Sequence, residues 1–240
     1  MIGQSQVREP MRQLALDLQL ADYARFESFH AGANELAVAA LHDTASLAEP
    51  RVIWIWGASG SGRSHLLQAC VAVAAANDFA CAWLPLAADA GLAPEMLEGM
   101  GTLDLICIDD VDAVAGNDAW ERALFRLFEE LRERGGRLVA SASAPPAAAG
   151  FRLPDLASRL ASGPTFRLGP LDDADQLEAL KRRAHWRGLD LPDDTGRYLL
   201  RRVERSNAAL FEMLDELDAA ALSAQRRLTI PFVKQVLGLE

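Results

Sequence analysis

The fold of this chain is decided by one stretch, Val52-Ile53-Trp54-Ile55-Trp56-Gly57-Ala58-Ser59-Gly60-Ser61-Gly62-Arg63-Ser64. Five apolar residues predict a buried strand, a loop rich in glycine and serine follows, and an amphipathic helix begins at about Ser64. The loop matches the spacing GxxxxGK[ST], except that Arg63 stands where lysine is usual. Glycines let backbone N–H groups approach phosphate oxygens, and the helix N-terminus adds partial positive charge. The stretch therefore predicts a phosphate-binding loop within an α/β domain.

We expect a nucleotide to contact most of this loop. The candidate binding residues are Gly57, Ser59, Gly60, Ser61, Gly62, Arg63 and Ser64. The hydroxyl of Ser64 is placed to ligate Mg²⁺. Arg63 keeps the positive charge of lysine without the compact ammonium, so nucleotide binding should survive better than hydrolysis. The alternative is a glycine-rich turn that holds no ligand.

A second candidate element lies about 45 residues beyond the loop, where the apolar run Leu103–Ile108 ends in Asp109 and Asp110. A strand that delivers carboxylates to its C-terminal end places them where open parallel sheets form their sites. Asp109 would hold Mg²⁺ through water, and Asp110 would polarise an attacking water. A doublet of acids that merely ends a strand is the alternative, and it weakens when a phosphate loop precedes it.

Short apolar runs alternate with amphipathic stretches from about residue 22 to residue 169, which predicts a five-stranded parallel sheet flanked by helices. The expected strands are Val52–Trp56, Cys81–Leu86, Leu103–Ile108, Arg137–Ala142 and Thr165–Leu168. Beyond Pro170 only helical periodicity remains, in Gln176–Trp186, Asp194–Val203, Ala208–Ala224 and Pro231–Leu237. We therefore expect an N-terminal arm over residues 1–21, an α/β domain over 22–169 and a small helical lid over 170–240.

Composition restricts the partners and the compartment. The net charge of −10 repels a polyanion and gives no general attraction to DNA. A cluster of lysine and arginine residues after Lys181 is the local exception, either as solvated helix faces or as a DNA contact. Cys70, Cys81 and Cys107 lie in apolar runs without paired or metal-ligand spacing, so we expect small core residues in a reducing cytoplasm. No stretch predicts a signal peptide or a membrane span.

Several longer runs resemble the AAA+ domain of the DnaA family and, within it, the Hda branch. They are Phe26-Glu27-Ser28-Phe29 with Gly32 and Asn34, Gly62-Arg63-Ser64-His65-Leu66-Leu67, Cys107-Ile108-Asp109, Leu153-Pro154-Asp155-Leu156-Ala157-Ser158-Arg159-Leu160 and Leu228-Thr229-Ile230-Pro231-Phe232-Val233-Lys234. The resemblance extends from about Gln13 to Leu239. The two runs beyond residue 150 are the specific ones, because any phosphate-loop protein could supply the run of the loop itself.

The resemblance implies an AAA+ P-loop NTPase fold that binds ADP or ATP with Mg²⁺, with Phe26, Phe29 and Asn34 lining the adenine pocket. It also implies that Arg159 is an arginine finger, which reaches from one subunit to the γ-phosphate held by a neighbour. A structural salt bridge of Arg159 within its own chain is the alternative. The polar sensor at a strand end falls on Ser143, and the lid arginine falls on Ala208, so we expect weak or no intrinsic hydrolysis.

The N-terminal run Gln13-Leu14-Ala15-Leu16-Asp17-Leu18 fits the QxxLx[LF] pattern of peptides that bind the bacterial sliding clamp. In such a peptide Gln13 makes directed hydrogen bonds, while Leu14, Leu16 and Leu18 offer apolar side chains to the partner. Chance, or packing within the protein's own core, is the alternative for so short a motif.

Together these features predict a cytoplasmic regulator that docks on the DNA polymerase III sliding clamp and stimulates ATP hydrolysis by DnaA, preventing re-initiation of replication. No helix-turn-helix pattern follows the last expected helix, so we expect no sequence-specific DNA binding. A homo-oligomer is left open. The main alternative is a helicase-loading or scaffold protein that stimulates no hydrolysis, and a small-molecule P-loop kinase is a third.

Overall fold

The computed structural model describes residues 24–49, 51–87, 91–202, 213–214, 216–217, 220 and 228–238. These residues form one parallel sheet whose strands lie in the order β2-β3-β4-β1-β5. The strands are β1 (Val52–Trp56), β2 (Cys81–Pro85), β3 (Leu105–Asp109), β4 (Arg137–Ala142) and β5 (Thr165–Arg167). The predicted five-stranded parallel α/β sheet is confirmed.

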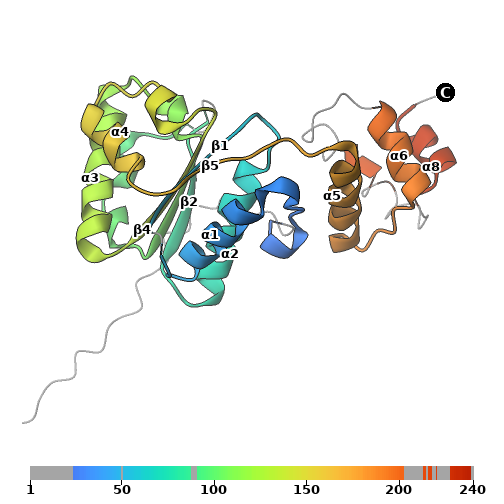
Figure 1. Ribbon diagram of the computed structural model, residues 1–240, viewed down its shortest axis with the longest axis horizontal. Helices are drawn as coiled ribbons and strands as arrows, with labels where there is room; N and C mark the ends of the chain where they lie inside the picture. The colour runs from blue at the N-terminus through green and yellow to red at the C-terminus, as the bar shows by residue number, and fades with distance from the viewer. Residues whose placement is uncertain are drawn as a thin grey trace, which may run out of the picture.

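Helices cover both faces of the sheet. In Figure 1, α1 (Glu35–Ala45) and α2 (Arg63–Ala76) lie on one face, and α3 (Asp118–Arg134) and α4 (Pro154–Leu160) lie on the other. The side chains of β1 alternate accordingly. Ile53 and Ile55 belong to the core cluster beneath α1 and α2, whereas Trp54 belongs to the cluster beneath α3 and α4. This period of two is the one expected for a strand that is buried on both faces.

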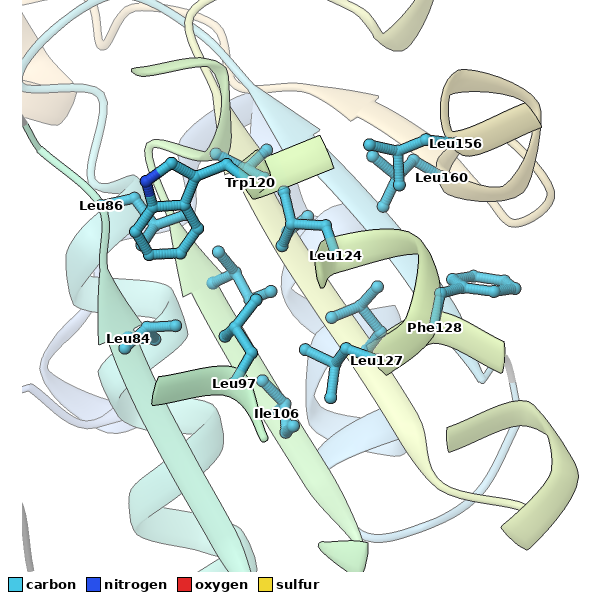
Figure 2. Close-up of a cluster of buried hydrophobic side chains, with 14 of the residues drawn as sticks. Leu84, Leu86, Leu97, Ile106, Trp120, Leu124, Leu127, Phe128, Leu156 and Leu160 are labelled. Carbon is cyan, nitrogen blue, oxygen red and sulfur yellow. The ribbon is translucent and has the colours of Figure 1, made fainter. Parts of the chain in front are cut away.

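The core beneath α3 fixes the position of α4. Figure 2 shows the inward side chains of α3, among them Leu124, Leu127 and Phe128, in one cluster with Leu156 and Leu160 of α4. Both α4 leucines are buried, and burying a leucine stabilises a fold by about 1.5–3 kcal/mol. The short helix α4 is therefore held by two well-buried side chains.

One strand begins later than expected. We predicted a strand from Leu103, but β3 begins at Leu105. The carboxylate Oδ2 of Asp104 accepts a hydrogen bond at 2.9 Å from the backbone N–H of Ala80, in the turn that precedes β2. Because the side chain of Asp104 is hydrogen-bonded to the turn before β2, the regular strand begins only after it, two residues later than we predicted.

The helical part follows the sheet. It contains α5 (Asp173–Trp186), α6 (Asp193–Arg202) and α8 (Ile230–Val236), which surround a separate apolar cluster that includes Leu180, Leu199 and Phe232. In Figure 1 these helices lie beyond one side of the α/β layers. The expected helix Ala208–Ala224, the motif Gln13–Leu18 and the position of Ala208 lie outside the described residues or mostly so.

The three cysteines are unbridged, and Cys70 and Cys107 are buried in the core. Burial raises the pKa of the Cys107 thiol well above its usual value, so this cysteine is an inert core residue. Among the described residues, the helices are too short or too polar to cross a membrane.

Candidate functional site

A pocket of about 300 Å³ lies between the α/β layers and α5. Five segments contribute to it, which are the glycine-rich loop, the segment before α1, the end of β3, the connection between β5 and α5, and α5 itself. The lining residues are Ser28, Phe29, His30, Asn34, Ser59, Gly60, Ser61, Gly62, Arg63, Ser64, His65, Asp110, Leu171, Ala179 and Arg183. The volume is at the lower end of what small-ligand pockets span.

The loop has the backbone of a phosphate site. Gly62 has φ +92°, a left-handed conformation that glycine adopts without strain, and it is the N-cap of α2. A Cβ on Gly62 would lie 2.5 Å from Cε2 of Phe29, so the ring of Phe29 packs directly on the loop. The hydroxyl of Ser61 is buried and has no hydrogen-bond partner among the described residues. Its proton is therefore available for donation to a phosphate oxygen in the pocket.

Arg63 engages the protein's own acceptors. Its Nη1 donates a hydrogen bond of 3.0 Å to the carbonyl oxygen of Gly57, and its Nη2 lies 2.8 Å from Oδ1 of Asp110. Burial and the neighbouring carboxylate of Asp109 raise the pKa of Asp110, and the guanidinium of Arg63 opposes that shift. The loop cation thus neutralises the acid that the sequence assigns to water activation.

The two acids at the end of β3 point to different surroundings. Asp109 is 3% exposed and accepts a hydrogen bond from the hydroxyl of Ser141 on β4, while Asp110 lines the pocket. The hydroxyl of Ser141 also accepts a hydrogen bond of 3.0 Å from the backbone N–H of Asp110. Of the pair, Asp110 is therefore the one that faces a ligand.

Ser141 is the polar side chain of β4 that touches the acids, and the sequence did not single it out. Ser143, expected at the end of the strand, lies just beyond β4, where its backbone N–H and hydroxyl both donate to Asp112. Side chains alternate between the two faces of a strand, so Ser141 and Ser143 point to the same side. Ser141 lies within β4, the strand that pairs with β3, whereas Ser143 lies beyond its end, and this pattern could have indicated Ser141.

The residues expected at the adenine end are divided between pocket and core. Phe29 and Asn34 line the pocket, and Oδ1 of Asn34 accepts a hydrogen bond of 2.9 Å from Gly169 N–H in the segment that leads to α5. Phe26 is buried against His42 instead, with ring centroids 5.4 Å apart. Gly57 supports the loop through its carbonyl oxygen and by packing against Leu168.

His65 joins the loop helix to the segment before α1. Its Nε2 donates a hydrogen bond of 2.9 Å to the carbonyl oxygen of Arg25, and its ring lies 5.4 Å from that of Phe29. The pKa of His65 is lowered from 6.5 to about 4, mainly by burial; the hydrogen bond to Arg25 opposes this shift and the charge of Arg183 adds to it. His65 is therefore neutral at physiological pH.

This gives a stability prediction. Because the pKa of His65 is about 4 in the folded protein and 6.5 without the fold, unfolding takes up a proton between these values. Stability from the neutral ring is complete above pH 6.5 and is lost as the pH falls towards 4. We expect the free energy of unfolding to fall by about 2–3 kcal/mol over this range. Urea denaturation at a series of pH values measures it.

The variant His65→Gln is the comparison for that experiment. Its side-chain amide can still donate to Arg25 but does not titrate, so the fall in unfolding free energy between pH 6.5 and 4 should be smaller than in the wild type. Parallel curves for the two proteins would show that His65 is not the titrating group.

One face of α5 closes the pocket. Asp175, Ala179 and Arg183 are spaced four residues apart on this face, and Ala179 and Arg183 line the pocket. Nε2 of His30 lies 2.8 Å from Oδ1 of Asp175, which ties α5 to the segment before α1. Arg183 is 9% exposed and lines the pocket, so the helical part brings a buried cation to this site. The sequence predicted Arg183 only as a member of the basic cluster, although its four-residue spacing from Asp175 and Ala179 places it on the same face of α5.

The other basic residues of the helical part are largely engaged. Nζ of Lys181 lies 2.7 Å and Nη2 of Arg197 lies 3.0 Å from Asp193. The guanidinium of Arg202 lies over the ring of Tyr198. These contacts are typical of solvated helix faces with ion pairs inside the chain. They favour that interpretation of the basic cluster over a DNA contact.

Arg159 lies on α4, away from the pocket of its own chain. Its side chain is 45% exposed, and Nε lies 3.0 Å from Oε1 of Glu129 on α3, without the alignment of a hydrogen bond. Arg132 pairs with the other oxygen of Glu129. An ion pair at such an exposed position contributes about 0–1 kcal/mol. Arg159 can therefore exchange Glu129 for another anion at small cost.

Two family models match consecutive parts of the chain. The bacterial DnaA ATPase domain matches residues 20–167, which is more than half of the chain, and the Hda lid domain matches residues 173–237. The two matches meet where β5 ends and α5 begins.

Solved structures agree with these matches in fold. Domain III of the replication initiation protein DnaA from Thermotoga maritima shares 21% identity, with 92% of this chain and 98% of that chain covered and a TM-score of 0.77. AMPPCP-bound DnaA from Aquifex aeolicus shares 21%, covering 85% and 68%, with a TM-score of 0.66. The Holliday junction branch migration motor RuvB of Thermotoga maritima shares 14%, covering 85% and 67%, with a TM-score of 0.63. The chain therefore belongs to the DnaA family of AAA+ proteins and is Hda-like, which confirms the resemblance seen in its sequence.

Proposed function

We propose that this protein binds ADP or ATP with Mg²⁺ and presents Arg159 to ATP held by DnaA, whose hydrolysis it stimulates. The protein docks on the sliding clamp loaded on DNA, works in the cytoplasm and converts the initiator to its ADP form, which prevents re-initiation. The division into an arm, an α/β domain and a lid at residues 22 and 170 is part of this proposal.

Nucleotide binding rests on the pocket. Its loop offers backbone N–H groups, the hydroxyl of Ser61, which has no hydrogen-bond partner in the described part of the chain, and the cation Arg63, and α5 adds the cation Arg183. Mg²⁺ bound to a nucleotide needs few protein ligands, and Ser64 and Asp110 bring oxygen donors of the required kind to the pocket. Asp109 would act through Ser141, with which it shares a hydrogen bond. The relative from Aquifex aeolicus binds AMPPCP, an ATP analogue, which supports an adenine nucleotide.

The observation that carries the proposal is the exposure of Arg159. The two leucines of α4 are buried and leave this guanidinium on the outside, where Glu129 is its one ion-pair partner among the residues that the structure describes. In hydrolysis, water attacks the γ-phosphorus, the bond to the bridging oxygen breaks, and ADP and phosphate leave. A guanidinium from a neighbouring subunit stabilises the charge that develops on the phosphoryl oxygens.

Clamp docking rests on the motif Gln13–Leu18, which lies outside the described residues. The test is a hydrolysis assay of ATP prebound to DnaA, with this protein and with the clamp loaded on DNA or omitted. We expect stimulation only with the loaded clamp, and expect its loss when Gln13, Leu16 and Leu18 are all replaced by alanine. Stimulation without the clamp, or by the triple variant, would contradict docking through this motif.

The contact between Arg63 and Asp110 predicts the effect of restoring lysine. A lysine ammonium cannot span the carbonyl of Gly57 and the carboxylate of Asp110 together, so Arg63→Lys should free Asp110 to activate water. We expect intrinsic ATP hydrolysis to rise by up to about 10²-fold, the lower part of what a general base contributes. Steady-state phosphate release measures the rate.

The matched control is Arg51→Lys, because Arg51 pairs with Glu49 on the exposed surface. It should leave the hydrolysis rate unchanged. If Arg63→Lys also leaves the rate unchanged, the ion pair with Asp110 does not limit hydrolysis.

A scaffold or helicase-loading protein is the second candidate function, and the contact between Arg159 and Glu129 favours it. In such a protein Arg159 has only a structural role within its own chain. The clamp-dependent assay separates the two, because a scaffold binds DnaA without changing its rate of hydrolysis.

A further inference from the structure

Glu121 is a buried carboxylate outside the pocket that neither the sequence nor the comparisons single out. It lies in the first turn of α3 and is 1% exposed. Its partners are three backbone N–H groups. Gly116 N–H donates to Oε1 at 2.7 Å, Leu153 N–H donates to Oε2 at 2.7 Å, and Arg152 N–H lies 3.0 Å from both oxygens.

The carboxylate is charged in this position. Burial by itself raises the pKa of Glu121, and the three backbone donors together with the charge of Arg152 outweigh it, so that the pKa lies below its usual value. A charged acceptor makes shorter and stronger hydrogen bonds than a neutral one. Glu121 therefore holds its three donors firmly at neutral pH.

The three donors lie in two segments, the one that leads into α4 and the loop that follows β3. Arg152 and Leu153 are the last residues before α4, whose first residue, Pro154, has no N–H of its own. Gly116 lies on the loop that follows Asp109 and Asp110, and its φ of +81° turns this N–H towards α3. One carboxylate thus connects the acidic end of β3 with the start of the helix that bears Arg159.

The rest of α4 is fixed by packing. Leu156 and Leu160 are buried in the cluster beneath α3, and Arg159 stands between them in sequence with its side chain exposed. Both leucines belong to the same buried cluster as Leu124, which lies one turn along α3 from Glu121 (Figure 2). Because Leu156 and Leu160 are held in the core, they act as a pivot, and a displacement at the start of α4 would tilt the helix and move the guanidinium of Arg159.

We propose that Glu121 is a positioning residue for Arg159. It fixes the start of α4 so that the exposed guanidinium is aimed at the γ-phosphate of a neighbour. This inference rests on the proposed function of Arg159. Arginine fingers require such support because a displacement of about 1 Å at a catalytic group costs about 10²-fold in rate.

The test uses Glu121→Gln, which keeps the size of the side chain but places an amide N–H₂ against backbone donors. We expect the maximal stimulation of DnaA hydrolysis to fall at least tenfold, while the concentration of variant at half-maximal stimulation and the affinity for ADP change less than twofold. If the variant instead contained less folded protein, the measured stimulation and the amount of ADP bound would fall by the same factor. Glu133→Gln, an exposed position on the same helix, should match the wild type.

Hydrogen exchange supplies a readout that does not depend on DnaA. In Glu121→Gln the N–H groups of Gly116, Arg152 and Leu153 should lose protection, while the β1 amides keep theirs. Glu121→Asp, which retains the charge but withdraws it by one methylene group, should give intermediate loss of protection and of stimulation, and it serves if the glutamine variant does not fold.

The outcomes separate the two proposals. Full maximal stimulation by a folded Glu121 variant, or unchanged exchange at Arg152 and Leu153, would overturn the role of Glu121 and leave the proposed function standing. A wild-type protein that stimulates no hydrolysis would overturn the proposed function and, with it, the positioning role, whatever the exchange shows.

Discussion

Arg159→Ala is expected to abolish the stimulation of DnaA hydrolysis, which corresponds to a loss of about 10³-fold or more in the stimulated rate. The guanidinium is the charge that this protein adds to a neighbour's ATP, and alanine leaves no charge there. Folding should be nearly unaffected, because the side chain is 45% exposed and its ion pair with Glu129 contributes little. Single-turnover hydrolysis of ATP prebound to DnaA, with loaded clamp, measures the rate.

The matched control is Arg132→Ala. Arg132 pairs with the same Glu129 and is more exposed, so this variant disturbs the same carboxylate without removing Arg159. It should stimulate hydrolysis as the wild type does, and both variants should bind the clamp equally. If Arg159→Ala stimulates at the wild-type rate, the guanidinium does not act in trans and the scaffold function is the better account.

Gly62→Ala is expected to weaken ADP binding by about 5-fold to 150-fold. Alanine at φ +92° costs about 1–3 kcal/mol of backbone strain, which the loop relieves by leaving the conformation that aims its N–H groups at phosphate. The added methyl group would also lie 2.5 Å from the ring of Phe29, so the aromatic side of the pocket must move as well. Calorimetric titration with ADP and Mg²⁺ measures the change in affinity.

Gly99→Ala provides the control for backbone strain alone. Gly99 has φ +80°, and a Cβ there meets no atom within 4 Å. The Gly99 variant should lose stability to a similar extent and keep its affinity for ADP. Equal affinity of Gly62→Ala and the wild type would mean that the loop does not need its left-handed glycine to hold the ligand.

Local patterns were enough to predict the fold. The strands β1 and β3 are mostly apolar runs that begin directly after a charged residue, and the glycine-rich loop requires a strand before it and a helix after it. The misjudged start of β3 shows the limit of this reasoning. Asp104 ends the preceding turn through a contact with Ala80, a residue 24 positions away, and a run of apolar letters contains no trace of such a contact.

The site was predictable where the chain is continuous and less so where distant segments meet. The loop from Ser59 to Ser64 lines the pocket as expected, because neighbouring residues determine its shape. The roles of Ser141 and Arg183 depend on how β4 lies beside β3 and how α5 packs over the loop. The hydrogen bond from the backbone N–H of Arg152 to Glu121, 31 positions away, also depends on tertiary packing. Sequence spacing alone does not predict which backbone groups a buried carboxylate will contact.

The account depends most on the pocket holding a nucleotide, and titration of the purified protein with ADP in the presence of Mg²⁺ tests this directly. We expect one ADP bound per chain, with binding weakened in a folded Arg183→Ala variant because α5 then brings no cation to the ligand. A folded wild-type protein that binds neither ADP nor ATP with Mg²⁺ would contradict the account.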